Sequence, residues 1–161
     1  MLAPLGHLVD FYARRRLPGA KLGRRLATRY LRAFDNNDVD MARNGELWLV
    51  RRLGSSRCVV ALDVGANRGE WTAAYLASNP SATVHAFEPV PGTFATLCES
   101  VRDVRMRAVN AGLSDRTGGA QIAAYANSYY SSIARHARLN AWMEPATIPI
   151  GLQRGDAYCS K

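Results

Sequence analysis

The residues best suited to chemistry in this chain are an acid and two glycines that follow an apolar run at 58–62. Asp63 ends the run, and Gly65 and Gly69 follow two and six residues later. Glycines at this spacing let the backbone turn sharply and approach a ligand closely, with a helix N-terminus beyond them. The segment therefore predicts a loop that holds a cofactor.

Two other residues of this loop bear on which cofactor it suits. A dinucleotide site normally carries G-x-G-x-x-G, and Asn67 stands at the place of the second glycine. Glu70, at the expected helix start, would repel a pyrophosphate arriving there. A cofactor that bears an amino acid suits the loop better, and a nicotinamide-dependent (NAD) oxidoreductase half-domain stays open as the alternative.

A second acid, Glu88, follows the next apolar segment, 25 residues after Asp63. The carboxyl ends of parallel strands meet at one edge of an open α/β sheet, and ligands bind there. A carboxylate at that edge can accept both hydroxyls of a ribose, and an acid favours a ribose without a phosphate. The alternative is a strand-end acid that is only solvated.

Apolar runs alternate with helical segments from residue 57 onward. We expect strands at 58–62, 83–87 and 104–109, and helices at 70–77 and 91–101. The run at 58–62 is typical of a strand buried on both faces. This alternation predicts a parallel sheet with crossover helices, and hence a doubly wound α/β domain.

After residue 110 the alternation breaks. Strands are expected at 120–125 and 147–150, a helix begins at 153, and 126–145 are expected to form a loop or lid. His136 in this segment is either a base or a surface residue. An acceptor pocket or a polar turn would be formed by Tyr129, Tyr130, Ser131 and Ser132.

The front of the chain is basic. The net charge is +8, and residues 1–57 hold 12 Arg and Lys against 5 Asp and Glu, whereas residues 58–161 hold 9 against 8. Helices are expected at 5–17, 21–34 and 46–53, with Trp48 in the core. Such a segment attracts phosphate backbones or anionic lipid head groups, or is simply a solvated helix face. Nucleic acid is disfavoured because aromatic and basic residues do not interleave.

Composition sets the broad class. The chain is 48% apolar and 21% charged, as in ordinary globular proteins. It shows neither an apolar run of the about 20 residues that span a bilayer nor a signal peptide, so a cytoplasmic location is expected. The three cysteines, Cys58, Cys98 and Cys159, lack the paired spacing of zinc or redox motifs, so no metal is expected and we expect them mostly buried. The preference for Arg over Lys is typical of a GC-rich bacterial genome.

Three ordered segments then resemble the successive motifs of the FkbM family of methyltransferases. They are LDVGANRG at 62–69, HAFEPVP at 85–91 and VNAGLSD at 109–115. The resemblance covers residues 44–159, and 155–159 are similar to the helix that leads into the family's next core strand. It implies S-adenosyl-L-methionine as cofactor and O-methylation of a hydroxyl on a sugar, glycolipid or polyketide-type acceptor.

The resemblance also implies roles for individual residues. The loop from Asp63 to Gly69 would cradle the amino-acid part of the cofactor, Glu88 would bind the ribose hydroxyls, and Asn110 with Ala111 would border the adenine. Ser114 and Asp115 are further candidates for that rim. The cofactor site implied in this way consists of Asp63, Gly65, Ala66, Asn67, Gly69, Glu88, Asn110 and Ala111.

The implied fold is a Rossmann-like class I methyltransferase sheet preceded by short N-terminal helices. We expect a basic helical extension at 1–56 and a partial methyltransferase domain at 57–161. Because the family's strand motif similar to Lys-Ile-Asp-x-Glu-Gly is absent after Cys159, the sheet is expected to be incomplete and the chain inactive. A third hypothesis is a noncatalytic basic module that binds nucleic acid or a membrane surface.

An incomplete sheet has a physical consequence. In the family's sheet the first strand is central, so without its neighbour the strand at 58–62 becomes an edge. An apolar edge strand is prone to pair with another chain. Self-association is therefore expected unless residues 120–150 cover the edge.

Overall fold

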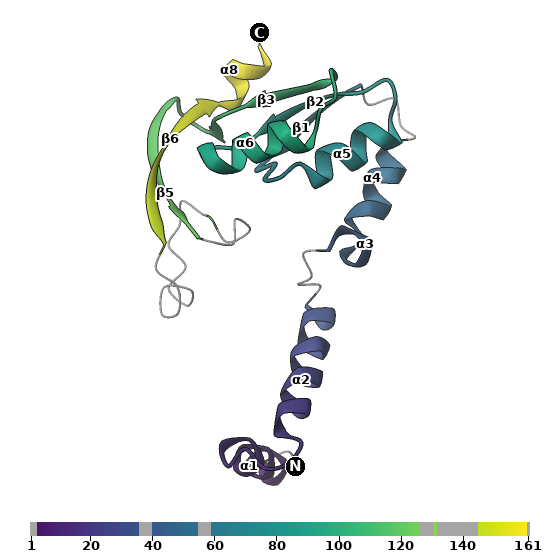
Figure 1. The fold of residues 1–161 in the computed structure, drawn as a ribbon, viewed down its shortest axis with the longest axis vertical. Coiled ribbons are helices and arrows are strands. Elements are labelled where there is room, and N and C mark those ends of the chain that lie inside the picture. The colour runs from purple at the N-terminus through teal and green to yellow at the C-terminus, as the bar shows by residue number, and fades with distance from the viewer. Residues whose placement is uncertain (1–2, 36–39, 55–58, 126–130, 132–144, 161) are drawn as a thin grey trace. The chain divides into compact units, whose positions relative to one another are not determined.

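The computed structural model describes residues 3–35, 40–54, 59–125, 131 and 145–160 (Figure 1). The chain divides into two compact units, Met1–Glu46 and Leu47–Lys161. The division therefore falls after the first residue of the helix at 46–54. The functional division into 1–56 and 57–161 stays a prediction.

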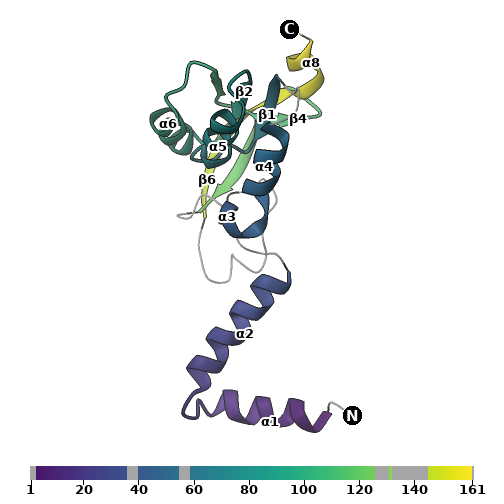
Figure 2. The same cartoon turned by 90° about the vertical axis from the view of Figure 1, so that its right-hand side faces the viewer.

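The first unit is helical. Its elements are α1 (Ala3–Arg14), α2 (Ala20–Phe34) and α3 (Met41–Asn44). In the turn between α1 and α2 (Figure 2), the Tyr12 hydroxyl donates a hydrogen bond to the carbonyl of Pro18. The helices expected at 5–17 and 21–34 are confirmed, whereas the short α3 was not predicted.

Helix α4 (Glu46–Gly54) confirms the helix expected at 46–53. Val50 is its one buried residue, and a Cβ placed on Gly54 would lie 2.7 Å from the carbonyl oxygen of Ser78. Trp48 was predicted in the core, and that prediction is wrong because its side chain is 70% exposed. Two residues along a helix correspond to about 200° of rotation, so Trp48 points away from the side that buries Val50.

Three parallel strands form the first sheet, in the order β1-β2-β3. They are β1 (Val60–Val64), β2 (Thr83–Phe87) and β3 (Met106–Val109), connected by α5 (Glu70–Ser78) and α6 (Pro91–Ser100) (Figure 1). The register pairs Val64 with Phe87 and Phe87 with Val109, so the three carboxyl ends are level. This confirms the predicted α/β architecture with a parallel sheet.

The two faces of this sheet are covered differently. On the face packed against α5, Val84 and Ala86 are fully buried. On the other face Leu62 is 40% and Val64 58% exposed. The prediction that the first strand is buried on both faces is therefore wrong for β1, because the helix that follows it packs on one face only.

Helix α8 (Gly155–Cys159) covers part of that second face. The ring of Tyr158 packs edge-on against His85 and Phe87, at centroid distances of 5.4 and 4.8 Å. The Tyr158 hydroxyl also lies 2.6 Å from Nδ1 of His85. His85 therefore has a packing role in the sheet.

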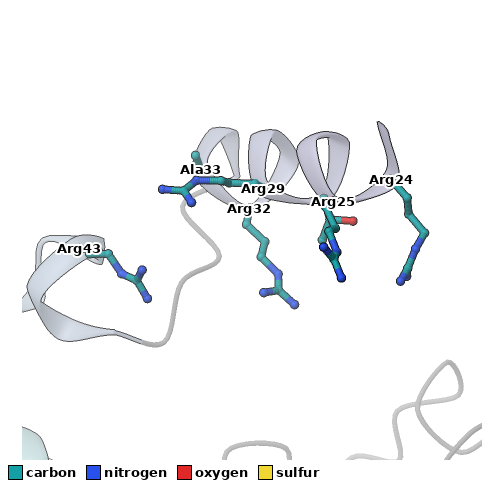
Figure 3. Close-up of a pocket in the computed structure, with 7 residues that line it drawn as sticks. Arg24, Arg25, Arg29, Arg32, Ala33 and Arg43 are labelled. Carbon is teal, nitrogen blue, oxygen red and sulfur yellow. The ribbon is translucent and has the colours of Figure 1, made fainter. Parts of the chain in front are cut away.

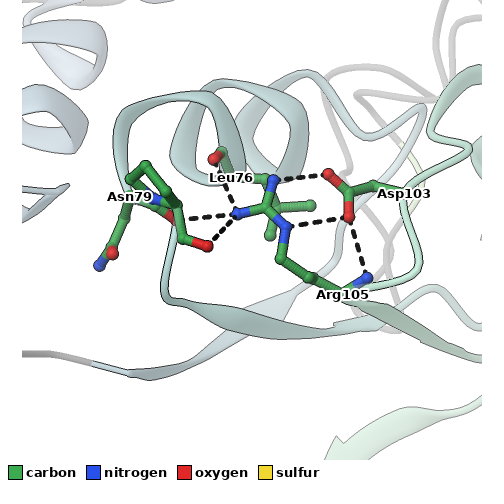
Figure 4. A network of polar contacts seen from close by, with 5 residues as sticks. Leu76, Asn79, Asp103 and Arg105 are labelled. Carbon is green, nitrogen blue, oxygen red and sulfur yellow. Dashed lines mark hydrogen bonds and ion pairs between the residues drawn. The ribbon is translucent and has the colours of Figure 1, made fainter.

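Arg105 closes the end of α5 (Figure 4). Its guanidinium donates hydrogen bonds to the carbonyls of Leu76, Asn79 and Pro80, at 3.2, 3.0 and 3.0 Å. Asp103 holds the same guanidinium through an ion pair of 2.6 Å. Because the last carbonyls of a helix have no partners within it, Arg105 fixes the end of α5 against the start of β3.

A second sheet has the order β4-β6-β5. Its strands are β4 (Gly112–Ser114), β5 (Gly118–Ala124) and β6 (Ala146–Arg154). The expected strands at 120–125 and 147–150 are confirmed as parts of β5 and β6, whereas β4 was not predicted. Ile122, Ile150 and Leu152 form a core with Val90, so this sheet supports the segment that follows β2.

Two cysteines depart from expectation. Cys98 and Cys159 are exposed, and Cys58 lies outside the described residues. Cys98 follows the fully buried Leu97 on α6, so it lies about 100° further round the helix, on the solvent side.

Within the described ranges, no group of three His, Cys, Asp or Glu could hold a metal ion. No helix in the described part of the chain is long and apolar enough to cross a bilayer.

Candidate functional site

The loop between β1 and α5 is wound in left-handed backbone conformations. The φ angles are +83° at Gly65, +50° at Asn67 and +87° at Gly69. Glycine adopts this region without a steric penalty, and asparagine tolerates it better than most residues. The N–H groups of Gly65 and Ala66 both donate to the carbonyl of Phe87 at 2.9 Å. The loop is therefore fixed to the carboxyl end of β2.

The two glycines of the loop have different surroundings. A Cβ on Gly69 would lie 2.5 Å from Cγ2 of Val101 and 2.7 Å from Cδ1 of Leu97. A Cβ on Gly65 would meet no atom within 4 Å. Gly69 thus lets the start of α5 pack against the end of α6, and Gly65 leaves the backbone open to a ligand at the edge of the sheet.

Asp63 lies in β1, one residue before the strand ends. Its Oδ2 accepts a hydrogen bond of 2.6 Å from the hydroxyl of Thr72. Thr72 is fully buried on α5 and was not among the predicted site residues. The hydroxyl fixes the Asp63 carboxylate on the face of the sheet that α5 covers.

Glu88 is almost completely buried at the end of β2, with 6% of the residue exposed. Its Oε1 accepts the N–H of Val90 at 2.9 Å and its Oε2 accepts the N–H of Asn67 at 3.0 Å. Burial raises the pKa of Glu88 above its ordinary 4.5, the two N–H hydrogen bonds lower it, and the charge of Asp63 raises it further. Glu88 is therefore an internal partner of the glycine loop and not a solvated strand-end acid.

Asn110 fixes the backbone that carries Glu88. Its Nδ2 donates to the carbonyl of Glu88 at 2.8 Å and to that of Pro89 at 3.3 Å. The N–H of Ala111 donates to the carbonyl of Val109 at 2.9 Å. This geometry assigns Asn110 a positioning role, and the expected contact of Asn110 and Ala111 with an adenine stays a prediction.

The structure brings the predicted site residues together at the carboxyl ends of the three parallel strands. Hydrogen bonds connect the β1 loop through Asn67 to Glu88, and Asn110 holds the backbone of the same glutamate. Ser114 and Asp115 lie in and just after β4, where the serine hydroxyl donates to the aspartate at 3.0 Å.

Most of the candidate residues in the segment at 126–145 are not among the described residues. Tyr129, Tyr130, Ser132 and His136 lie outside the described residues. Ser131 is described, and its hydroxyl oxygen accepts the N–H of Tyr125 at 3.3 Å. The proposed acceptor pocket therefore stays a prediction.

Comparison with known proteins adds the following. The family model described as Methyltransferase FkbM domain matches residues 63–147, which is more than half of the chain and includes all eight predicted cofactor residues. A crystal structure of the plantazolicin methyltransferase BpumL, in complex with a monoazolic desmethylPZN analog and SAH, is similar over 65% of this chain. That similarity has 10% identity and a TM-score of 0.36, and it covers 38% of the BpumL chain. No curated protein sequence matches this chain.

Proposed function

This chain belongs to the FkbM methyltransferase family, and from that premise we propose that its strand-end site binds S-adenosyl-L-methionine. The reaction it serves is O-methylation of a hydroxyl on a sugar, glycolipid or polyketide-type acceptor. When bound, the cofactor supplies an electrophilic methyl group on a sulfonium. Residues 57–161 provide the cofactor side of this reaction, and residues 1–56 are an extension.

The observation that carries the proposal is the hydrogen bond between Glu88 and the N–H of Asn67, 3.0 Å long. It places a carboxylate directly beside the glycine loop. Each carboxylate oxygen has two lone pairs, and each oxygen of Glu88 uses one on a backbone N–H. The remaining lone pairs would accept the two ribose hydroxyls.

The charges around the loop favour this cofactor over a dinucleotide. The segment 63–70 and residue 88 together carry three carboxylates, those of Asp63, Glu70 and Glu88, and one guanidinium, that of Arg68. Glu70 occupies the first turn of α5, where its charge compensates the positive end of the helix. An excess of negative charge disfavours a pyrophosphate and suits the ammonium and sulfonium groups of S-adenosyl-L-methionine.

Backbone geometry supports the same assignment. Gly65 combines a left-handed φ of +83° with open space where a Cβ would stand. A ligand can therefore approach the main chain at this point, as the amino-acid part of the cofactor would. Methyl transfer depends mainly on alignment of the acceptor with the methyl group, and a fixed cofactor is the first requirement for that alignment.

The substitution Gly65→Ala tests this proposal, with Gly45→Ala as the matched control. Both glycines have a left-handed φ, +83° and +93°, and neither has an atom within 4 Å of an added Cβ. The two changes therefore strain the backbone alike. Calorimetric titration of the full chain with S-adenosylhomocysteine should show weaker binding for Gly65→Ala only. Equal affinities in the two variants would contradict the assignment of this loop.

A further inference from the structure

Helix α2 has two chemically distinct halves. At about 100° per residue, its side chains separate into an apolar half-cylinder and a basic one. The larger apolar residues are Leu22, Leu26, Tyr30, Leu31 and Phe34. The basic residues are Lys21, Arg24, Arg25, Arg29 and Arg32. The helix contains no acidic residue, so its five cations are not compensated along the helix.

The apolar half of α2 is uncovered. No residue of the helix is buried, and Leu22, Leu26 and Phe34 are 59%, 60% and 75% exposed. The rings of Tyr30 and Phe34 stack on each other, with centroids 6.0 Å apart, and so extend one apolar ridge. In an aqueous setting this ridge is unfavourable, because each exposed apolar side chain forgoes the free energy of burial.

The basic half concentrates charge. A surface pocket is lined by Arg24, Arg25, Thr28, Arg29, Arg32 and Ala33 of α2 together with Arg43 of α3 (Figure 3). Figure 3 shows the side chains of Arg24, Arg25 and Arg32 extending to one side of the ribbon of α2. Arg43 is paired with Asp40 at 3.0 Å, whereas no ion pair in the described ranges involves the four arginines of α2. Those four guanidinium groups remain able to bind phosphate.

One class of partner satisfies both halves of the helix at once. A nucleic acid or a free phosphate would neutralise the arginines and leave the apolar ridge in water. An apolar protein groove would cover the ridge and leave five cations at its rim. An anionic bilayer offers phosphate head groups beside acyl chains, and long arginine side chains reach the head groups while the helix lies in the interface.

We propose that α2 docks the chain on an anionic membrane surface. The apolar half of the helix inserts at the boundary between head groups and acyl chains, and Arg24, Arg25, Arg29 and Arg32 bind lipid phosphates. This surface is formed by other residues than those of the strand-end site. The proposal therefore stands or fails independently of cofactor binding.

Co-sedimentation of the full chain with lipid vesicles tests the electrostatic half of the proposal. Phosphatidylcholine vesicles with phosphatidylglycerol should bind the chain, and pure phosphatidylcholine vesicles should bind it much more weakly. The double variant R24Q/R32Q should bind roughly 30-fold more weakly, because each basic residue near an anionic surface contributes about a fivefold gain. The control R102Q/R116Q removes the same charge from exposed positions of the second unit and should bind like the wild type.

The double variant L22Q/L26Q tests the apolar half. It keeps every charge and the helix-forming tendency, and it should lose at least about tenfold in vesicle binding. Circular dichroism of each variant checks that helix content is retained. Salt titration of the wild type measures the charge dependence without any substitution, and added salt should release the chain.

Two results would overturn the proposal. Equal binding to neutral and anionic vesicles would show that the arginines do not recognise head groups. Unchanged binding by L22Q/L26Q, together with binding of a DNA duplex that only R24Q/R32Q weakens, would identify a surface for phosphate alone.

Discussion

Glu88 at the end of β2 accepts the backbone N–H of Asn67 in the loop after β1, across 3.0 Å. This hydrogen bond joins the two segments that a cofactor would have to contact together. It also places a carboxylate where water has little access, since only 6% of Glu88 is exposed. The protonation state of Glu88 is therefore coupled to the stability of the site.

Substitution of Glu88 by Gln should change how stability depends on pH. Burial raises the pKa of Glu88 in the folded chain above its ordinary 4.5, so the fold favours the protonated acid. The contribution of Glu88 to the free energy of unfolding is therefore full below pH 4.5 and is lost as the pH rises through the higher folded pKa. Urea unfolding should show the wild type losing stability relative to Glu88→Gln between acidic and neutral pH.

The exposed Glu99 supplies the control for that experiment, since Glu99→Gln removes a carboxylate from the surface of α6. The difference in the free energy of unfolding between Glu99→Gln and the wild type should not change with pH as the difference for Glu88→Gln does. If the wild type instead gained stability relative to Glu88→Gln over this range, the raised pKa would be wrong.

Alanine at Gly69 should destabilise the chain more than alanine at Gly65. Both positions have a left-handed φ, but only at Gly69 would the new Cβ overlap Val101 and Leu97, at 2.5 and 2.7 Å. We expect Gly69→Ala to reduce the free energy of unfolding by roughly 2–4 kcal/mol and Gly65→Ala by about 1 kcal/mol. Urea unfolding of both variants measures the difference, and equal losses would show that the packing of α5 on α6 does not require glycine.

Substitution of Thr72 by Val should weaken the site without creating a cavity. Valine has a similar shape but cannot donate the 2.6 Å hydrogen bond to Asp63, so the half-buried carboxylate of Asp63 loses a donor. The free energy of unfolding should fall by about 1–3 kcal/mol, and affinity for S-adenosylhomocysteine should fall with it. Thr96→Val on α6 removes a hydroxyl that bonds only within its own helix. An equal effect of both substitutions would argue against a positioning role for Thr72.

Self-association should depend on β1. This strand lies at one end of the described order β1-β2-β3, and Leu62 and Val64 expose apolar side chains on its uncovered face. The described parts of 120–150 pair within the second sheet and not with β1. Sedimentation velocity should show association at high concentration, and Leu62→Lys should reduce it.

Val104→Lys is the matched control, because Val104 is fully exposed and lies outside the strands. It should associate like the wild type. If the wild-type chain stayed monomeric at high concentration, the prediction that β1 mediates self-association would be wrong.

Local signals predicted the first sheet well. The strand expected at 83–87 is β2 residue for residue, and the helix expected from residue 91 begins there, because proline at a first helical position is compatible with its fixed φ. The loop at 65–69 was also predicted, since glycine spacing reports directly on backbone conformation. In each case the determining residues are neighbours in the sequence.

The second sheet was predicted only in part because its pairing is remote in sequence. Ala124 pairs with Ala146, and Gly112 with Leu152. A proline such as Pro149 in β6 normally argues against the interior of a sheet. In the described sheet, however, β4 pairs with β6 only from Leu152 onward. The part of β6 that contains Pro149 therefore pairs with β5 alone. Sequence patterns do not show such an arrangement.

The partners of the site acids were missed for the same reason. Thr72 reaches Asp63 only because α5 packs over β1, and residue type gave no sign of it. Asn110 was predicted from the family resemblance to border an adenine, which stays a prediction, and its bond to the backbone of Glu88 was not foreseen. Sequence thus indicated which residues gather at the edge of the sheet, and the structure showed which of them support the others.

The most direct test of the cofactor site is a calorimetric titration of the full chain with S-adenosylhomocysteine and, separately, with NAD. The carboxylates of Asp63 and Glu88, the left-handed Gly65 and the fixed Asn67 predict saturable binding of S-adenosylhomocysteine and much weaker binding of NAD. Tighter binding of NAD, or no binding of S-adenosylhomocysteine, would contradict the account.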